Sequence, residues 1–557
     1  MKRAIKFYIA TVLIFAMSSC GEQFLEVLPE DNPVLDGFYQ NKEQIRTVTA
    51  TLYGRPWFNF NDKFSWAAGD GLSGDMYQDY QDEGQFFFFT FTPANSIVSN
   101  SWASLYSIIA RTNVILADMP RIAGGYGVSE EDINAGLAEA RFFRGMAYYF
   151  LAEYWGDVPI VEDPASIIAG GDYKLPRNTY KSVLQYTAND FAFAAEHLPS
   201  SDSPGRVTSW SAKGMLAKIK LTQASDLSDP NSSANFAEAA ALAKDVIQNS
   251  GYALMANYED LFKPENDNNS ESLFALQWIS GAWGTGNSRQ AVFARSSIIT
   301  GNSEAWGGGK SMTYDYVRAM DANDGNLDSV ILDKRQPWIF MTVGDFYPDM
   351  NTDEGGYLYE IVSRDDDGNQ LEYKSPVCNN IKKYVVGSQD DIGASVINQA
   401  SPLNQYMLRL ADVYLIFAEA TLGGAGSTTD GEALGYFNEI RARAGLNPRT
   451  SISFMDILTE RRMEFGAEGI NWFDVKRFYR RSASDAIDYL NDQERAYRVE
   501  AIDGATQADE NNPAFYEAVE PDSPVVISPA DMVLPVPENE VVANPRLSEE
   551  PVEWIFE

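Results

Sequence analysis

The chain has 557 residues, a formal net charge of −36 at pH 7 and a pI near 4.4. This acidic balance argues against a nucleic-acid partner, because the chain has no basic excess to neutralise phosphates. It also argues against charge-driven adhesion to an anionic lipid surface. The length and the 45% hydrophobic content are sufficient for a large buried core.

Cysteine and histidine are scarce, which limits the chemistry of the chain. The two cysteines are Cys20 and Cys378, so a thiolate metal cluster is excluded and the core must be stable without an intramolecular disulfide. The only histidine, His197, ends an apolar helical stretch and is expected at a helix end. One histidine argues against a Ser-His-Asp relay and against a multi-histidine zinc site. We expect no cofactor and no bound metal, because the acidic clusters around Gly325 and Gly368 lack EF-hand spacing.

The first twenty residues have the pattern of an export signal. Three basic residues, Lys2, Arg3 and Lys6, precede an apolar run over 7–17 that is too short for a membrane span. The run ends in Ser-Ser-Cys-Gly, which resembles the lipobox of bacterial lipoproteins. That resemblance implies that residues 1–19 are removed and that Cys20 carries a lipid. The alternative is an ordinary secretory signal in which the cysteine has no role.

Helical periodicity recurs in pairs along the mature chain and predicts antiparallel helix hairpins. Four such pairs predict a mainly α fold of tetratricopeptide-like hairpins stacked into a superhelical scaffold. The predicted helices are 36–53 with 97–119, 129–155 with 179–197, 209–225 with 236–250, and 405–422 with 431–444, followed by 454–465 and 472–480.

Long irregular segments interrupt the helix pairs and are expected to carry the function. One runs over about 54–95, and the longest, 255–404, contains strand-like runs at 273–279 and 357–362. Residues 366–369, Asp-Asp-Gly-Asn, are typical of a hairpin turn. We expect a single domain over 20–557 with an N-terminal helical part (20–254), a loop-rich insertion (255–404) and a C-terminal helix pair with a cap (405–557).

Several sequence blocks together resemble the SusD/RagB family of outer-membrane nutrient-binding lipoproteins. Each block is weakly specific alone, but their order behind a lipobox is highly specific. The arginines and glutamates within them are predicted to form ion pairs between packed helices, with a structural role. The blocks are residues 24–29, 140–159, 408–420, 436–446, 460–477 and 534–545.

The resemblance implies a non-catalytic protein at the exterior of the outer membrane. Family members bind glycans or other large nutrients and cover a SusC-like TonB-dependent transporter. The implied partners of this chain are therefore an oligo- or polysaccharide and such a transporter, with attachment to the membrane through the N-terminal lipid.

Glycan binding needs flat aromatic side chains for the C–H faces of the sugar and polar side chains for its hydroxyl edges. Both residue types occur beside glycines in the two long irregular segments, a pattern that suits exposed loops better than a core. The sequence predicts that Trp278 lies in the core and favours burial of the aromatic run 86–91. The predicted ligand-binding residues are Trp66, Asp75, Tyr77, Trp283, Asn287, Arg289 and Trp306.

Two other function classes stay open from the sequence. A repeat scaffold could bind a peptide in its concave face, in which case the loop tryptophans would be dispensable. A glycoside hydrolase needs two carboxylates facing each other across a cleft, and no motif singles out such a pair among the 79 acidic residues.

Overall fold

The computed structural model describes residues 38–556 except 79, 164–166, 168, 172, 324–332, 366, 374–378, 496–497 and 520–523. The predicted signal segment, Cys20 and Cys378 lie outside the described residues. No helix in the described ranges is both long enough and apolar enough to cross a membrane.

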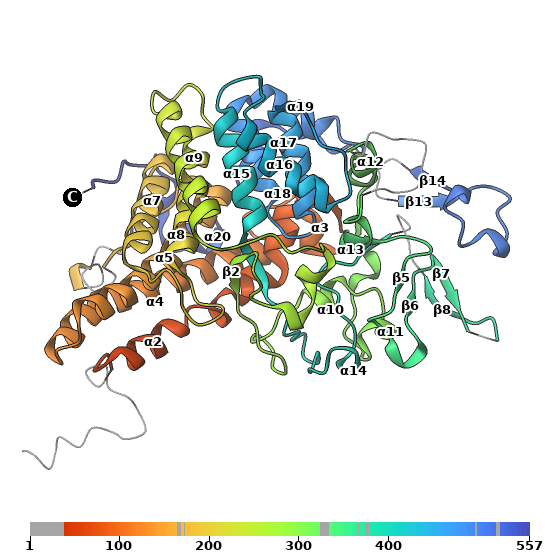
Figure 1. Ribbon diagram of the computed structural model, residues 1–557, viewed down its shortest axis with the longest axis horizontal. Helices are drawn as coiled ribbons and strands as arrows, with labels where there is room; N and C mark the ends of the chain where they lie inside the picture. The colour runs from red at the N-terminus through yellow and green to blue at the C-terminus, as the bar shows by residue number, and fades with distance from the viewer. Residues whose placement is uncertain are drawn as a thin grey trace, which may run out of the picture.

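Long helices form one side of the molecule and short elements the other (Figure 1). The N-terminal helices are α2 (Lys42–Ala50), α3 (Gln81–Phe87), α4 (Ser96–Gly125), α5 (Glu130–Trp155), α7 (Tyr180–His197), α8 (Ser209–Ala224) and α9 (Ser232–Asn249). The C-terminal helices are α15 (Leu410–Leu422), α16 (Gly431–Arg443), α17 (Phe454–Phe465), α18 (Asn471–Arg481), α19 (Ala483–Asn491) and α20 (Glu538–Ala543).

Local capping explains why the sequence located several helix ends accurately. The side chain of Ser129 caps α5 by accepting a hydrogen bond from the Asp132 backbone N–H, and Thr179 caps α7 in the same way. Helix α5 ends at Trp155, and the capping residue that follows, Gly156, has a φ of +73°, which is unfavourable for other residues. His197 is the last residue of α7, as predicted.

The helices pack as hairpins in three of the four predicted pairs. Helix α5 packs on α7, α8 on α9, and α15 on α16. The first pairing was wrong, because α2 and α4 both pack against α5. The predicted helix 405–422 was also wrong in its first turn, since Gln405–Arg409 forms strand β10 before α15 begins.

The insertion over 255–404 is made of short helices and two-stranded antiparallel pairs. Strand β2 (Ser272–Leu276) overlaps the first part of the predicted run 273–279, pairs with β10 and is buried along its whole length. The short helices are α10 (Arg289–Phe293), α11 (Ser297–Thr300), α12 (Tyr314–Asn323), α13 (Gln336–Ile339) and α14 (Gln389–Ile392).

Three further strand pairs lie inside the insertion, and a fourth joins β1 of the first irregular segment to β3 of the insertion. Two more pairs lie nearer the C-terminus. The strands β5 to β8 protrude at the same end as β13 and β14 (Figure 1). The predicted turn near Gly368 joins β7 to β8, although Asp366 itself is not described. The pairs are β1 (Met76–Tyr77) with β3 (Ser311–Met312), β4 (Phe340–Met341) with β9 (Asn380–Ile381), β5 (Phe346–Tyr347) with β6 (Tyr357–Leu358), β7 (Val362–Arg364) with β8 (Gln370–Tyr373), β11 (Ser427–Thr428) with β12 (Ile452–Ser453), and β13 (Arg498–Ala501) with β14 (Tyr516–Val519).

The charged residues of α17 form the predicted ion-pair network, and the network is buried. Glu464 accepts from Arg335 at 3.2 Å, from Arg409 at 2.8 Å and from Arg443 at 2.5 Å. Burial alone would raise the pKa of Glu464, but these guanidinium groups hold it at about 2. The network fixes α17 to the insertion and to α16, so these charges stabilise the scaffold.

The arginines of α5 are structural too, as predicted. Arg144 forms a bidentate pair with Asp190 of α7 at 2.8 Å and lies over the ring of Tyr186. The guanidinium of Arg141 lies 4.1 Å from the centroid of the Phe193 ring. Two arginines on one face of α5 therefore join it to α7.

Candidate functional site

Two of the predicted aromatic residues are exposed, and both lie on short loops of the insertion. The side chain of Trp283 is 54% exposed and that of Trp306 is 49% exposed. Exposed apolar side chains that gather in one area, unlike single ones, mark sites that bind a ligand or a partner. These two residues are therefore the starting point of the candidate site.

The Trp283 loop is a short turn that follows the end of β2. Its base is closed by a hydrogen bond from the Ile279 backbone N–H to the Thr285 carbonyl at 2.8 Å. Gly281 has a φ of +103°, which only glycine adopts easily, so the chain turns sharply there. The Trp283 ring packs edge-on against Phe58, with centroids 5.0 Å apart, and this contact holds the indole in place without covering it.

Trp306 is held against α10 by its own backbone. Its N–H donates to the Ala291 carbonyl at 2.8 Å, and the next N–H, of Gly307, donates to the Ala294 carbonyl at 2.8 Å. A Cβ at position 307 would lie 1.9 Å from the Phe293 carbonyl oxygen, so glycine is required there. The close approach keeps the indole of Trp306 at the surface on a rigid support.

A third segment, over 397–401, connects the two tryptophan loops. The Asn398 side-chain amide donates to the Gly281 carbonyl at 3.1 Å, and the Gln399 N–H donates to the Glu304 carboxylate at 3.0 Å. Both residues have left-handed backbone, with φ of 58° and 51°. Such conformations in residues other than glycine concentrate at functional sites.

Together these segments form what we call the tryptophan surface, a mixed apolar and polar area without a basic side chain among its members. Its apolar part includes two isoleucines that the sequence analysis missed, Ile279 at 73% and Ile397 at 50% exposure. The members are Ile279, Trp283, Trp306 and Ile397, with Glu304, Asn398 and Gln399.

The other five predicted ligand-binding residues are buried, which corrects the expectation that they contact a ligand. Each is at most 2% exposed, so none has surface for a glycan. The glycines beside them serve close packing of segments and do not mark exposed loops. The five residues are Trp66, Asp75, Tyr77, Asn287 and Arg289.

Three of these buried residues support the loops from below. The Asn287 side chain donates to the Leu403 carbonyl at 2.9 Å, and its backbone pairs with Ser401. The Arg289 guanidinium donates to the Ala467 carbonyl at 3.0 Å and to Ser65 Oγ at 2.8 Å. The Trp66 ring packs edge-on against Phe293 of α10, on the same helix that holds Trp306.

Asp75 and Tyr77 join the first irregular segment to the scaffold. Asp75 accepts a hydrogen bond from Arg462 Nε at 2.7 Å and another from Asn471. Burial raises the pKa of Asp75, and the Arg462 charge opposes that shift. Tyr77 lies in β1 with its ring against Phe87.

The prediction for Trp278 is confirmed, whereas burial of the aromatic run 86–91 is confirmed only for Phe86 and Phe87, because Phe88, Phe89 and Phe91 are half-buried. Trp278 is 5% exposed and lies in the core. Phe86 and Phe87 are buried, as favoured, although they belong to helix α3 and not to a strand.

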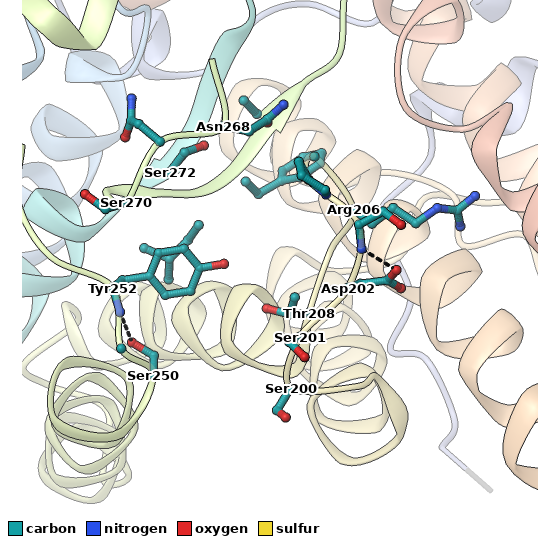
Figure 2. A pocket seen from close by; sticks show the side chains of 18 residues that line it. Ser200, Ser201, Asp202, Arg206, Thr208, Ser250, Tyr252, Asn268, Ser270 and Ser272 are labelled. Carbon is teal, nitrogen blue, oxygen red and sulfur yellow. Dashed lines mark hydrogen bonds between the residues drawn. The ribbon is translucent and has the colours of Figure 1, made fainter. Parts of the chain in front are cut away.

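A separate polar pocket of about 300 Å³ lies among the loops between α7, α8, α9 and β2 (Figure 2). Its wall is rich in serine, and the Tyr252 N–H donates to Ser250 Oγ at 3.2 Å. Its one arginine, Arg206, is paired with Glu139 at 2.7 Å. Among the described residues, no group of three or more histidine, cysteine, aspartate or glutamate side chains could hold a metal ion.

Comparisons with known proteins agree with this architecture over nearly the whole chain. A family model described as the SusD family matches residues 255–554. A second, described as starch-binding and associating with the outer membrane, matches residues 23–221. A SusD-like protein of Bacteroides ovatus is 35% identical over all of this chain and 99% of its own length. The chain belongs to the SusD family.

Solved structures place the chain in the SusD-like fold. A crystal structure described as being with xylogluco-oligosaccharide shares 33% identity at a TM-score of 0.80, covering 92% of this chain and 99% of that one. Surface glycan-binding protein A from Bacteroides uniformis, at 20% identity, covers 91% of this chain and 98% of its own with a TM-score of 0.66, a likeness that shows the fold alone. SusD-like glycan-binding proteins are non-catalytic, in agreement with the expectation for this chain.

Proposed function

We propose that this SusD-like protein captures an oligo- or polysaccharide at the tryptophan surface and passes it to a SusC-like TonB-dependent transporter. The observation that carries the binding step is the pair of half-exposed indoles, Trp283 and Trp306, held on adjoining loops. Indole faces suit the C–H faces of sugar rings. The polar groups of Glu304, Asn398 and Gln399 are placed beside them for hydroxyls.

The ligand class we propose is a neutral glycan with a chain long enough to contact both indoles. Glu304 carries the only charge among the members of the tryptophan surface, and a uronate or sulfate would be repelled by it. The structure at 33% identity described with xylogluco-oligosaccharide supports a xyloglucan-type ligand as the first to test.

The membrane part of the proposal rests on the sequence. Cys20, in its lipobox-like context, would carry the lipid, and the family description already includes association with the outer membrane. The lipid would leave the folded part at the cell exterior, where a glycan can reach the tryptophan surface.

A glycan array with the full chain in mild detergent tests the binding step. The expected result is binding to neutral polysaccharides, xyloglucan among them, with weak or absent signals for sulfated and uronic-acid-rich polymers. Binding confined to anionic polymers, or to no glycan at all, would contradict the proposal. Co-purification with a SusC-like transporter from the native membrane tests the delivery step separately.

A further inference from the structure

Asn287 lies in the chain between the Trp283 loop and the helix that holds Trp306. It follows Thr285, whose carbonyl closes the base of the Trp283 loop, and it precedes Ala291, whose carbonyl accepts from the Trp306 N–H. Asn287 is only 1% exposed, so it has no surface for a glycan. Any effect of this residue on binding must therefore act through the two tryptophans.

The backbone of Asn287 joins this junction to the segment 397–401. Its N–H donates to the Ser401 carbonyl at 2.8 Å, and the Ser401 N–H donates to the Asn287 carbonyl at 3.1 Å. The two segments approach closely, because a Cβ at Gly286 would lie 2.3 Å from the Ala400 Cα. The segment 397–401 also bonds to both tryptophan loops, so the backbone pair fixes all three segments to one another.

The side chain of Asn287 adds three hydrogen bonds, and two of them reach residues distant in the sequence. Its Oδ1 accepts from the Arg289 N–H at 3.1 Å, where α10 begins, and from Asn61 Nδ2 at 3.3 Å. Its Nδ2 donates to the Leu403 carbonyl at 2.9 Å. All three bonds are buried, so removing the amide would leave their partners unpaired and away from water.

The bond to Asn61 reaches the aromatic support of Trp283. Asn61 follows Phe58 by one turn of chain, and the Phe58 ring packs against the Trp283 indole with centroids 5.0 Å apart. Asn61 is itself 1% exposed and lies in a short π-helix, Phe60–Phe64. One asparagine side chain thus contacts both the segment that supports Trp283 and the helix that holds Trp306.

We propose that Asn287 is a positioning residue of the glycan site, which fixes one indole relative to the other without touching the glycan. The inference rests on the proposed function and deepens it, because it makes the affinity for a chain that contacts both indoles depend on a buried amide. The cost of ordering loops is subtracted from the free energy of binding, so a junction that orders them beforehand raises affinity.

The affinity of Asn287→Ala for the neutral glycan that binds best on the array tests this role. The change removes the three side-chain bonds and keeps the backbone pair with Ser401. Binding to the full chain in mild detergent, well below the thermal midpoint, should weaken about tenfold. Asn287→Ser is a milder variant that takes its place in every comparison if Asn287→Ala does not fold. Its hydroxyl can still accept from the Arg289 N–H but is too short to reach Leu403 or Asn61, so binding should weaken about fivefold.

Asn113→Ala is the matched control. Asn113 is a buried asparagine of α4 that donates to the Val161 carbonyl at 2.6 Å and accepts from Arg144 at 3.0 Å. Neither bond involves a segment of the tryptophan surface. Its loss should lower the thermal midpoint, as the loss of Asn287 should, but leave glycan affinity unchanged. A residue that only stabilised the fold would behave like Asn113, so this comparison separates positioning from stability.

A double-mutant cycle separates positioning from direct contact with the glycan. In the Trp283→Ala background that indole is no longer present to be oriented, so adding Asn287→Ala should weaken binding less than twofold. The inference is overturned if both Asn287 variants bind as tightly as wild type, if Asn113→Ala loses as much affinity as Asn287→Ala, or if the tenfold loss persists in the Trp283→Ala background.

The tryptophan variants distinguish failure of this inference from failure of the proposed function. If Trp283→Ala and Trp306→Ala both keep full affinity, the proposed function fails and the role of Asn287 fails with it. If both lose affinity and the Asn287 variants do not, only the positioning role fails.

Discussion

The side-chain amide of Asn398 donates a hydrogen bond to the backbone carbonyl of Gly281 at 3.1 Å, across 117 positions of sequence. This bond joins the Trp283 loop to the segment 397–401. The next residue of that segment, Gln399, donates its backbone N–H to Glu304 in the Trp306 loop. The two exposed indoles are thereby parts of one surface, although they come from separate loops.

The change Asn398→Asp tests this connection. Aspartate has the same shape and tolerates the left-handed backbone, but its carboxylate cannot donate to the Gly281 carbonyl. Losing the bond leaves the Trp283 loop less ordered before binding. This should make the free energy of glycan binding about 1 kcal/mol less favourable, which is about a fivefold loss of affinity. Calorimetric titration checks the result, with Asn134→Asp on α5 as a control for the added charge. Equal affinities for wild type and Asn398→Asp would show that the connection has no role in binding.

Glu464 should make stability depend on pH in the acid range. Its pKa is held at about 2 in the folded state, below its ordinary value, so its contribution is present above pH 4.5 and lost as pH falls toward 2. The change Glu464→Gln leaves buried arginine charges uncompensated and should cost about 3–5 kcal/mol of unfolding free energy at pH 7.

Denaturant unfolding at pH 7, 4 and 3 measures this difference between Glu464→Gln and wild type. The difference in unfolding free energy between wild type and Glu464→Gln should become smaller at each lower pH. Wild type loses the stabilisation from the ionised carboxylate as Glu464 becomes protonated. A gap that stays constant over these pH values would show that the charge of Glu464 does not stabilise the network.

Lys382 should have the opposite pH dependence. Burial lowers its pKa to about 7, and its ammonium donates to the Val385 carbonyl at 2.8 Å, while no carboxylate among the described residues lies at hydrogen-bond distance. Below pH 7 Lys382 is charged in the folded protein, and the buried charge lowers stability. Between pH 7 and 10.5 the lysine is neutral in the folded state but protonated in the unfolded state, so the unfolding free energy of wild type rises with pH.

The change Lys382→Met removes that cost and should raise the unfolding free energy at pH 6 by up to about 5 kcal/mol, because a pKa lowered from 10.5 to about 7 corresponds to about 1.4 kcal/mol for each pH unit. The gain should fade as the pH approaches 10, where lysine is neutral in the folded protein. Unfolding curves at both pH values check this. A Met variant that is less stable at pH 6 would show that the packing of the ammonium against Trp338 and Tyr347 outweighs its desolvation.

Cys20→Ala should release the protein from the membrane without altering its binding surface. Membrane fractionation is expected to recover the variant as soluble protein, and its glycan affinity should equal that of wild type. Variant protein that still sediments with the outer membrane would contradict lipid attachment at this cysteine.

The sequence predicted the helical scaffold well because its signals are local. Ser129 and Thr179 cap helices by bonding to backbone N–H groups only three residues further along the chain. The alternating charges in α17 indicate ion pairs even though the sequence does not show which residues they pair with. The sequence analysis missed that 405–422 divides into a strand and a helix, because a short apolar run is equally compatible with a helix and with a buried strand such as β10.

The candidate site was predicted only in part, for a physical reason. A tryptophan beside glycine can lie on an exposed loop, as Trp283 does, or pack where a glycine lets two segments approach, as Trp66 does near Gly69. Nothing in the residues themselves separates these cases. Ile397 and Asn398 could not have been found, because they lie more than 100 positions from the Trp283 loop and carry no aromatic signal.

The most direct test of the central claim is the affinity of Trp283→Ala and Trp306→Ala for the neutral glycan that binds best on the array. Each change should weaken binding about 30-fold, as expected of a tryptophan worth about 2 kcal/mol, with no change in the thermal midpoint. Tyr173→Ala, at an aromatic side chain that is 65% exposed elsewhere, should bind as wild type. Unchanged affinity in both tryptophan variants would contradict the assignment of the tryptophan surface as the glycan-binding site.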